Sequence, residues 1–106
     1  MGYDGALVQG YLSQAHESSL LTDREKHLVG LAVTLTRGCQ VCTRNRIAKA
    51  RPAGIGDDVL NALVDVVAAV NAGVAAATAR EGFRLADEAA AGACGALCSP
   101  DSSGGR

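Results

Sequence analysis

Two cysteines three residues apart, Cys39 and Cys42, form the pattern with the clearest chemistry in this sequence. They stand where a helix is expected to begin, and the free amides and partial positive charge of a helix N-terminus favour the thiolate form of cysteine. Thiols at this spacing can close into a disulfide within one turn, and thiolates react with peroxides and disulfides. The pair therefore indicates thiol redox chemistry. The alternative is a pair of buried cysteines that act as small hydrophobic residues.

Two further cysteines, Cys94 and Cys98, lie near the C-terminal end of the sequence. At this spacing they share one face of a helix, and together with Cys39 and Cys42 they would supply a four-thiolate zinc site. The glycines and serines that surround them favour a flexible tail over a preformed metal cage. We therefore expect a reduced pair of tail cysteines, with no metal and no other cofactor.

Composition narrows the class of protein. The chain has 106 residues, which is the size of one domain, and its net charge of −1 lacks the basic excess expected of a nucleic-acid-binding protein. The first residues show neither a basic stretch nor an apolar one, so we expect no secretory signal. No apolar run approaches the roughly 18 residues that a membrane span needs. We expect a cytoplasmic protein without nucleic-acid or membrane partners, in a compartment where thiols are mostly reduced.

The elements that must position these cysteines are helices. Aromatic residues make up 3% of the sequence, and alanine and leucine, which are strong helix formers, dominate its hydrophobic share. The pattern predicts an all-α fold, an antiparallel bundle of about five helices over residues 1–93, followed by a Gly/Ser-rich tail over 94–106. The expected helices are 4–18, 23–37, 39–50, 57–71 and a fifth that ends near 90, with a joint at Ala72–Gly73.

Helix boundary signals support most of these limits. Asp4 is the expected N-cap of the first helix, and Thr22 with Glu25 forms a capping box before the second. Gly38 fits its C-cap, and Pro52 ends the third. Since alanine buries little apolar area, a chain so rich in it gains stability by packing against another subunit. We therefore expect a homo-oligomer.

The segments around the cysteines resemble the carboxymuconolactone decarboxylase family, and more closely its alkylhydroperoxidase D-like branch. The resemblance is carried by residues 21–33, 37–39, 54–59 and 68–70, in the right order and spacing over roughly residues 20–80. It implies an all-α fold that assembles into dimers, trimers or hexamers. It also implies a thiol-dependent peroxide reductase that takes electrons from a dihydrolipoyl-type or similar thiol donor.

The resemblance extends to individual site residues. The family pattern is a Glu twelve residues before the first cysteine, followed by Cys-x-x-Cys-x-x-x-His. Cys39 and Cys42 match both cysteines, whereas His27 stands at the Glu position and Arg46 at the His position. Histidine can move protons near neutral pH, but the guanidinium of arginine stays protonated and can only stabilise a thiolate electrostatically.

These residues define the expected site: Cys42, Cys39, His27 and Arg46. The resemblance assigns the attack on peroxide to Cys42, with Cys39 as proton donor and resolving thiol, while the position of Cys39 nearest the free amides favours Cys39 as the more acidic thiol. The expected function is reduction of peroxides or disulfides by the cysteine pair. The alternative is a non-enzymatic dithiol or metal-binding module that kept the fold after losing the proton relay.

Overall fold

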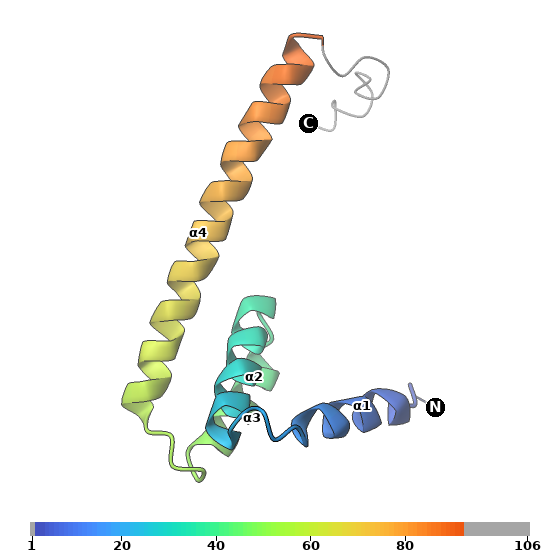
Figure 1. Ribbon diagram of the computed structural model, residues 1–106, viewed down its shortest axis with the longest axis vertical. Coiled ribbons are helices and arrows are strands. Elements are labelled where there is room, and N and C mark those ends of the chain that lie inside the picture. Colours follow the sequence, from blue (N-terminus) through green and yellow to red (C-terminus); the bar gives the residue numbers. More distant parts are fainter. Residues whose placement is uncertain (1, 93–106) are drawn as a thin grey trace. The chain divides into compact units, whose positions relative to one another are not determined.

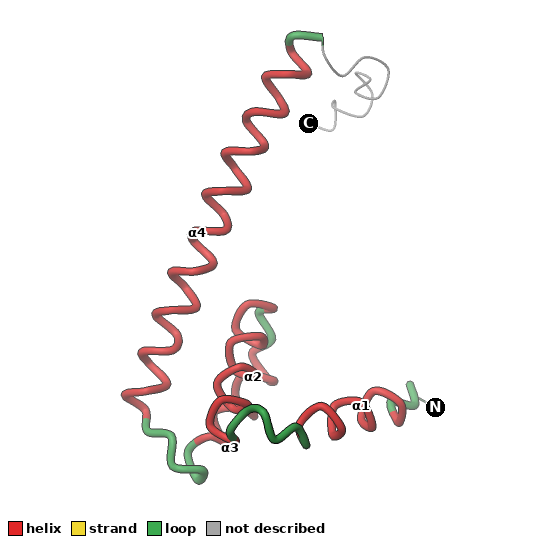
Figure 2. Tube along the Cα trace, viewed as in Figure 1, coloured by secondary structure: helices red, strands yellow, loops and turns green. Residues whose placement is uncertain are grey.

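The described part of the protein, residues 2–92 of a computed structural model, contains four helices and no strands. These helices are α1 (Ala6–His16), α2 (Asp23–Arg37), α3 (Gln40–Ala50) and α4 (Asp57–Ala90), as shown in Figure 1 and, by secondary structure, in Figure 2. The all-α prediction is confirmed. The expected tail, 94–106, lies outside the described residues, and so do Cys94 and Cys98.

Helix α1 begins two residues later than expected. Its N-cap is Gly5, which has no side chain that could cap the helix. The prediction that Asp4 is the N-cap was therefore wrong by one residue, although Asp4 Oδ1 accepts a hydrogen bond from the Ala6 N–H at 3.0 Å. No residue of α1 is buried.

Helix α2 has the boundaries that its capping signals predict. Thr22 Oγ1 accepts a hydrogen bond from the Glu25 N–H at 3.1 Å, and Glu25 Oε1 accepts one from the Thr22 N–H at 2.8 Å, which completes the capping box. At the other end, Gly38 has φ +77°, the left-handed conformation that closes a helix and that glycine adopts without strain.

Helix α3 follows α2 after two residues, Gly38 and Cys39, and packs against it. It ends at Ala50, two residues before Pro52, as the proline predicts. The following turn contains Gly54 at φ +90°, and the backbone N–H of Ile55 donates to the carbonyl of Ala50 at 3.1 Å. This turn brings the start of α4 back toward α3.

Helix α4 is a single helix of 34 residues, so the expected joint at Ala72–Gly73 and the separate fifth helix were wrong. A glycine inside a helix costs only about 1 kcal/mol relative to alanine. Six of the residues from 68 to 77 around Gly73 are alanine, the strongest helix former. Ion pairs of Arg84 with Glu81 (2.6 Å) and with Glu88 add support at helical spacing.

The buried core gathers the apolar faces of α2, α3 and the first turns of α4. Its buried residues are Leu31, Ala50, Ile55 and Leu60, and partly buried side chains complete it: Leu28, Leu35, Ile47, Val59 and Leu63. The chain divides into two compact units, of which the first ends at Val67 and the second begins at Ala68. The core and both cysteines of the candidate site belong to the first unit.

The composition of α4 corrects one expectation. By length and composition, this helix is apolar enough to cross a membrane, with a mean hydropathy of 1.8 over an 18-residue window. The expectation that no segment of the chain approaches a membrane span was therefore wrong. Between Leu60 and Ala79, Asp65 is the only charged residue, and Asn61, Asn71 and Thr78 are the other polar ones.

Candidate functional site

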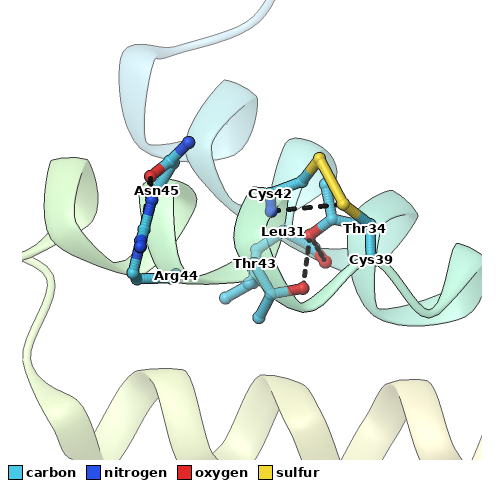
Figure 3. The surroundings of a disulfide bond; sticks show 7 residues. All are labelled: Leu31, Thr34, Cys39, Cys42, Thr43, Arg44 and Asn45. Atoms are coloured by element: carbon cyan, nitrogen blue, oxygen red, sulfur yellow. Dashed lines mark hydrogen bonds between the residues drawn. A yellow bond between two sulfur atoms is a disulfide. The ribbon is translucent and has the colours of Figure 1, made fainter.

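A disulfide joins Cys39 and Cys42 at the N-terminus of α3, where the two Cα atoms lie 5.3 Å apart (Figure 3). Cys39 occupies the N-cap position, and its Sγ accepts a hydrogen bond from the backbone N–H of Cys42 at 3.2 Å. A sulfur at this position receives the partial positive charge of the helix N-terminus. The fold therefore places Cys39 where a released thiolate is stabilised.

A pair of threonines ties this turn to helix α2. Thr43 Oγ1, from α3, donates a hydrogen bond to Thr34 Oγ1 at 3.0 Å, and Thr34 Oγ1 donates to the carbonyl of Leu31 at 3.1 Å. Both hydroxyls lie next to the disulfide in Figure 3. Since Leu31 is one of the most buried residues of the protein, this chain of hydrogen bonds anchors the disulfide turn to the core.

The two cysteines line different cavities. Cys42 lines a pocket of about 770 Å³, which we call the Cys42 pocket, and Cys39 lines a second one of about 650 Å³, the Cys39 pocket. Most of the residues that line the Cys42 pocket have polar side chains, and the full lining is Gln9, Leu12, Ser13, His16, Asp23, Lys26, His27, Thr34, Cys42, Asn45, Arg46 and Lys49. The Cys39 pocket includes apolar Leu35, Ile47 and Ala48 beside Arg44 and Arg51. A small molecule therefore meets different surroundings at each sulfur.

His27 and Arg46 both line the Cys42 pocket, so the structure brings together with Cys42 the two positions selected by the family resemblance. Both side chains are half-buried. The guanidinium of Arg46 lies against the backbone of Gly30: a Cβ added there would come within 2.8 Å of Arg46 Nε. Absence of a side chain at Gly30 thus provides the space in which the Arg46 guanidinium sits.

The three arginines near the cysteines, Arg37, Arg44 and Arg46, do not line the same pocket. Arg46 lines the Cys42 pocket, Arg44 lines the Cys39 pocket, and Arg37 lines neither. The Arg44 guanidinium turns along its own helix, where Nε and Nη2 donate to Asn45 Oδ1 at 3.3 and 3.2 Å (Figure 3). Of these three arginines, Arg46 alone lines the pocket that contains Cys42.

Sequence reasoning did not identify Thr34, Asn45 and Lys49 as site residues. A helical spacing of three, four or seven residues from the predicted site residues would have indicated them. On α3, Cys42, Asn45, Arg46 and Lys49 follow one face, and Thr34 follows His27 by seven residues on α2. Projection of both helices from the cysteine and the histidine would have selected these residues.

No group of three or more potential metal ligands occurs among residues 2–92. The four-thiolate zinc hypothesis requires Cys94 and Cys98, which the structure does not describe. The site as described is therefore a dithiol–disulfide pair with polar neighbours.

Comparisons with known proteins show the family to which the chain belongs. The sequence profile of the carboxymuconolactone decarboxylase family matches residues 5–88. A crystal structure of a protein from Methanobacterium thermoautotrophicum has the same fold with a TM-score of 0.69 and 30% sequence identity, and the match covers 74% of this chain and 91% of that one. No functionally curated protein matches the chain. The extent of the profile match and this structural likeness show that the chain belongs to the carboxymuconolactone decarboxylase family.

Proposed function

We propose that this protein is a thiol-dependent oxidoreductase of the alkylhydroperoxidase D-like kind, which cycles Cys39 and Cys42 between dithiol and disulfide. The observation that carries the proposal is the disulfide itself, formed between two residues of one turn and accessible from the Cys42 pocket. A structural disulfide usually connects distant parts of a chain, since closure of a longer loop removes more entropy from the unfolded state. A loop of two intervening residues contributes little stability, which favours a redox role.

In the first half of the cycle, the dithiol form of the protein reduces the substrate and is itself oxidised to the disulfide. A Cys42 thiolate attacks one sulfur of a substrate disulfide, and one substrate thiolate leaves. The Cys39 thiolate then attacks Cys42 Sγ, which forms the Cys39–Cys42 disulfide and releases the second substrate thiol. With a peroxide, Cys42 takes the terminal oxygen as sulfenic acid and an alcohol leaves; attack by Cys39 then releases water.

Arg46 favours disulfides over peroxides as substrates. Cleavage of a peroxide needs a proton at the departing oxygen, and general acid–base help is typically worth about 10² to 10⁴ in rate. Arg46 holds the position of the family's histidine but keeps its proton. Thiol–disulfide exchange depends instead on the thiolate fraction and on the acidity of the leaving thiol, and a nearby cation supports both.

The decisive experiment uses dihydrolipoamide as the electron donor and subtracts its direct reaction with each substrate. It compares turnover of a small disulfide with turnover of hydrogen peroxide and cumene hydroperoxide, in the full chain and in Cys39→Ser and Cys42→Ser variants. We expect wild-type protein to reduce the disulfide and both variants to lose turnover. A dimedone-type probe should label sulfenic acid on Cys42 in the Cys39→Ser variant. Labelling restricted to Cys39 would reverse the roles of the two thiols. Absence of turnover with every substrate would leave a non-enzymatic dithiol module on this fold.

A further inference from the structure

The Cys42 pocket has an excess of positive charge in a chain whose net charge is −1. Three cationic side chains line it, Lys26, Arg46 and Lys49, together with one carboxylate, Asp23. Lys26 already has partners, because its Nζ lies 3.9 Å from Asp23 and donates to the His16 carbonyl at 2.6 Å. The positive charge left over belongs to Arg46 and Lys49.

Neither of these two cations has an internal counter-ion. Among residues 2–92, the ion pairs involve Lys26, Arg51 and Arg84, and the hydrogen bonds include none from Arg46 or Lys49. The Arg46 guanidinium is half-buried against Gly30, where a cation without an anion is less stable than in water. A guanidinium in such a place pairs well with a carboxylate, which it can bind through two parallel hydrogen bonds.

The Cys39 pocket has less unpaired positive charge. Of its two arginines, Arg51 is held by Asp57 through bonds of 2.9 and 3.1 Å. Arg44 has no carboxylate partner among the described residues, but its guanidinium donates to the side-chain amide oxygen of Asn45. Within this part of the chain, the Cys39 pocket therefore has one cation without a counter-ion, whereas the Cys42 pocket has two, and neither of these two has a hydrogen-bond partner.

We propose that the Cys42 pocket binds a small thiol bearing a carboxylate, which acts as the reductant of the Cys39–Cys42 disulfide. This inference rests on the proposed function and names its electron donor. The carboxylate pairs with Arg46 and Lys49, and the donor thiolate attacks Cys42 Sγ. The bond between Cys42 and Cys39 breaks, and the Cys39 thiolate leaves with its sulfur on the Cys42 N–H.

A second donor thiol completes the step. It attacks the donor sulfur of the mixed disulfide, which releases the Cys42 thiolate and the oxidised donor disulfide. Two donor thiols thus lose two electrons and two protons, and the protein gains a Cys39–Cys42 dithiol. Departure of Cys39 is favoured because a thiolate at a helix N-cap is a good leaving group.

The test measures reduction of the oxidised full chain carrying Cys94→Ser and Cys98→Ser. In this variant the Cys39–Cys42 disulfide is the only one that can be reduced. Three thiols of different charge are compared: 3-mercaptopropionate (carboxylate), 2-mercaptoethanol (neutral) and cysteamine (ammonium). Rates are expressed per thiolate, and reduction is followed by alkylation and mass spectrometry. We expect the carboxylate thiol to exceed the ammonium thiol by about fivefold or more at low ionic strength, and the ratio to approach one in about 0.5 M salt.

Variants locate the effect. Arg46→Gln and Lys49→Gln should each lower the carboxylate-to-ammonium ratio at least twofold, whereas Arg24→Gln, which removes an exposed arginine of α2 outside the pocket, should keep it. In Cys39→Ser, the remaining Cys42 thiol should prefer 5,5′-dithiobis(2-nitrobenzoate), which carries carboxylates, over neutral 4,4′-dithiodipyridine. The Cys39 thiol of Cys42→Ser should show a smaller preference.

The outcomes separate the two proposals. Ready reduction by all three thiols at equal thiolate-corrected rates, or a charge preference confined to Cys39, overturns the carboxylate-thiol inference while the redox function stands. Resistance of the disulfide to every thiol, dithiothreitol included, overturns the proposed function itself.

Discussion

The Arg46 guanidinium lies against the backbone of Gly30, so a single substitution at Gly30 can test its role. Gly30→Ala should displace the guanidinium, because a Cβ would lie 2.8 Å from Arg46 Nε. The end of a flexible arginine can move, and alanine stabilises a helix by about 0.5 to 1 kcal/mol relative to glycine. We therefore expect a folded protein of equal or higher stability whose preference for carboxylate thiols falls as in Arg46→Gln.

The matched control is Gly10→Ala, a helical glycine of α1 with open space around its Cα. It should change stability in the same direction without changing the preference among thiols. Thermal unfolding and the three-thiol rate comparison measure both effects. An unchanged preference in Gly30→Ala would mean that the choice among thiols does not depend on the position of the Arg46 guanidinium.

Replacement of Arg46 tests the proton relay. Arg46→His should raise peroxide turnover, and His27→Glu should add to it, because the two positions line one pocket with Cys42 and would act together. A gain of up to about 10² is within the reach of general acid–base catalysis. Steady-state assays with peroxide and with a small disulfide provide the measurement. If wild-type protein already turns over peroxide rapidly and Arg46→His slows it, Arg46 takes a direct part in the reaction.

At the scale of elements, the ion pair of Arg51 and Asp57 joins the end of α3 to the start of α4. The hydrogen bonds from Arg51, and after them its charge, lower the pKa of Asp57 below its ordinary value of 3.8. A carboxyl whose pKa is lower in the folded state stabilises the fold above the unfolded-state pKa, and this contribution is lost as pH falls through the folded-state value. The window therefore lies below about pH 4.

We expect Asp57→Asn to lower the free energy of unfolding at pH 7 and to make progressively less difference as the pH falls below about 4. Urea unfolding followed by circular dichroism at several pH values measures this. Asp65→Asn, on the same helix, is the control for loss of one carboxylate. A destabilisation by Asp57→Asn that is the same at pH 7 and at pH 2.5 would assign the role of Asp57 to something other than its charge.

The elements also show what sequence could and could not predict. Thr22, Gly38 and Pro52 act within their own turns, so the ends of α2 and α3 followed from local chemistry. Gly73 did not end a helix, because one glycine is a small cost against many alanines. At the site, both cysteines were found from their own spacing, and His27 and Arg46 through the family pattern. Thr34 and Lys49 were not found. Helical spacing from His27 and Cys42 places them on the same helix faces, but only the packing of α2 against α3 shows that these faces meet.

At the scale of the whole molecule, folding of a single chain buries few side chains in the described part. The buried residues of the described part are Leu31, Ala50, Ile55 and Leu60. Large apolar side chains of α1 and α4 are exposed, such as Leu7 (91%) and Phe83 (74%). Apolar burial provides the main favourable term in folding, at about 25 cal/mol per Å². A chain that buries so little by itself gains the remainder by covering these faces.

We therefore predict a homo-oligomer whose subunits cover the exposed apolar residues of α1 and α4. Light scattering at micromolar concentration should return a multiple of the 10.7 kDa chain mass. Phe83→Asp should lower that mass or raise the concentration at which subunits dissociate, because it would bury a charge in an apolar interface. Thr78→Asp places the same charge on the same helix without loss of a large apolar side chain and should have a smaller effect. A monomer mass for wild-type protein contradicts the prediction, and flotation of that monomer with lipid vesicles would show that a bilayer covers α4 instead.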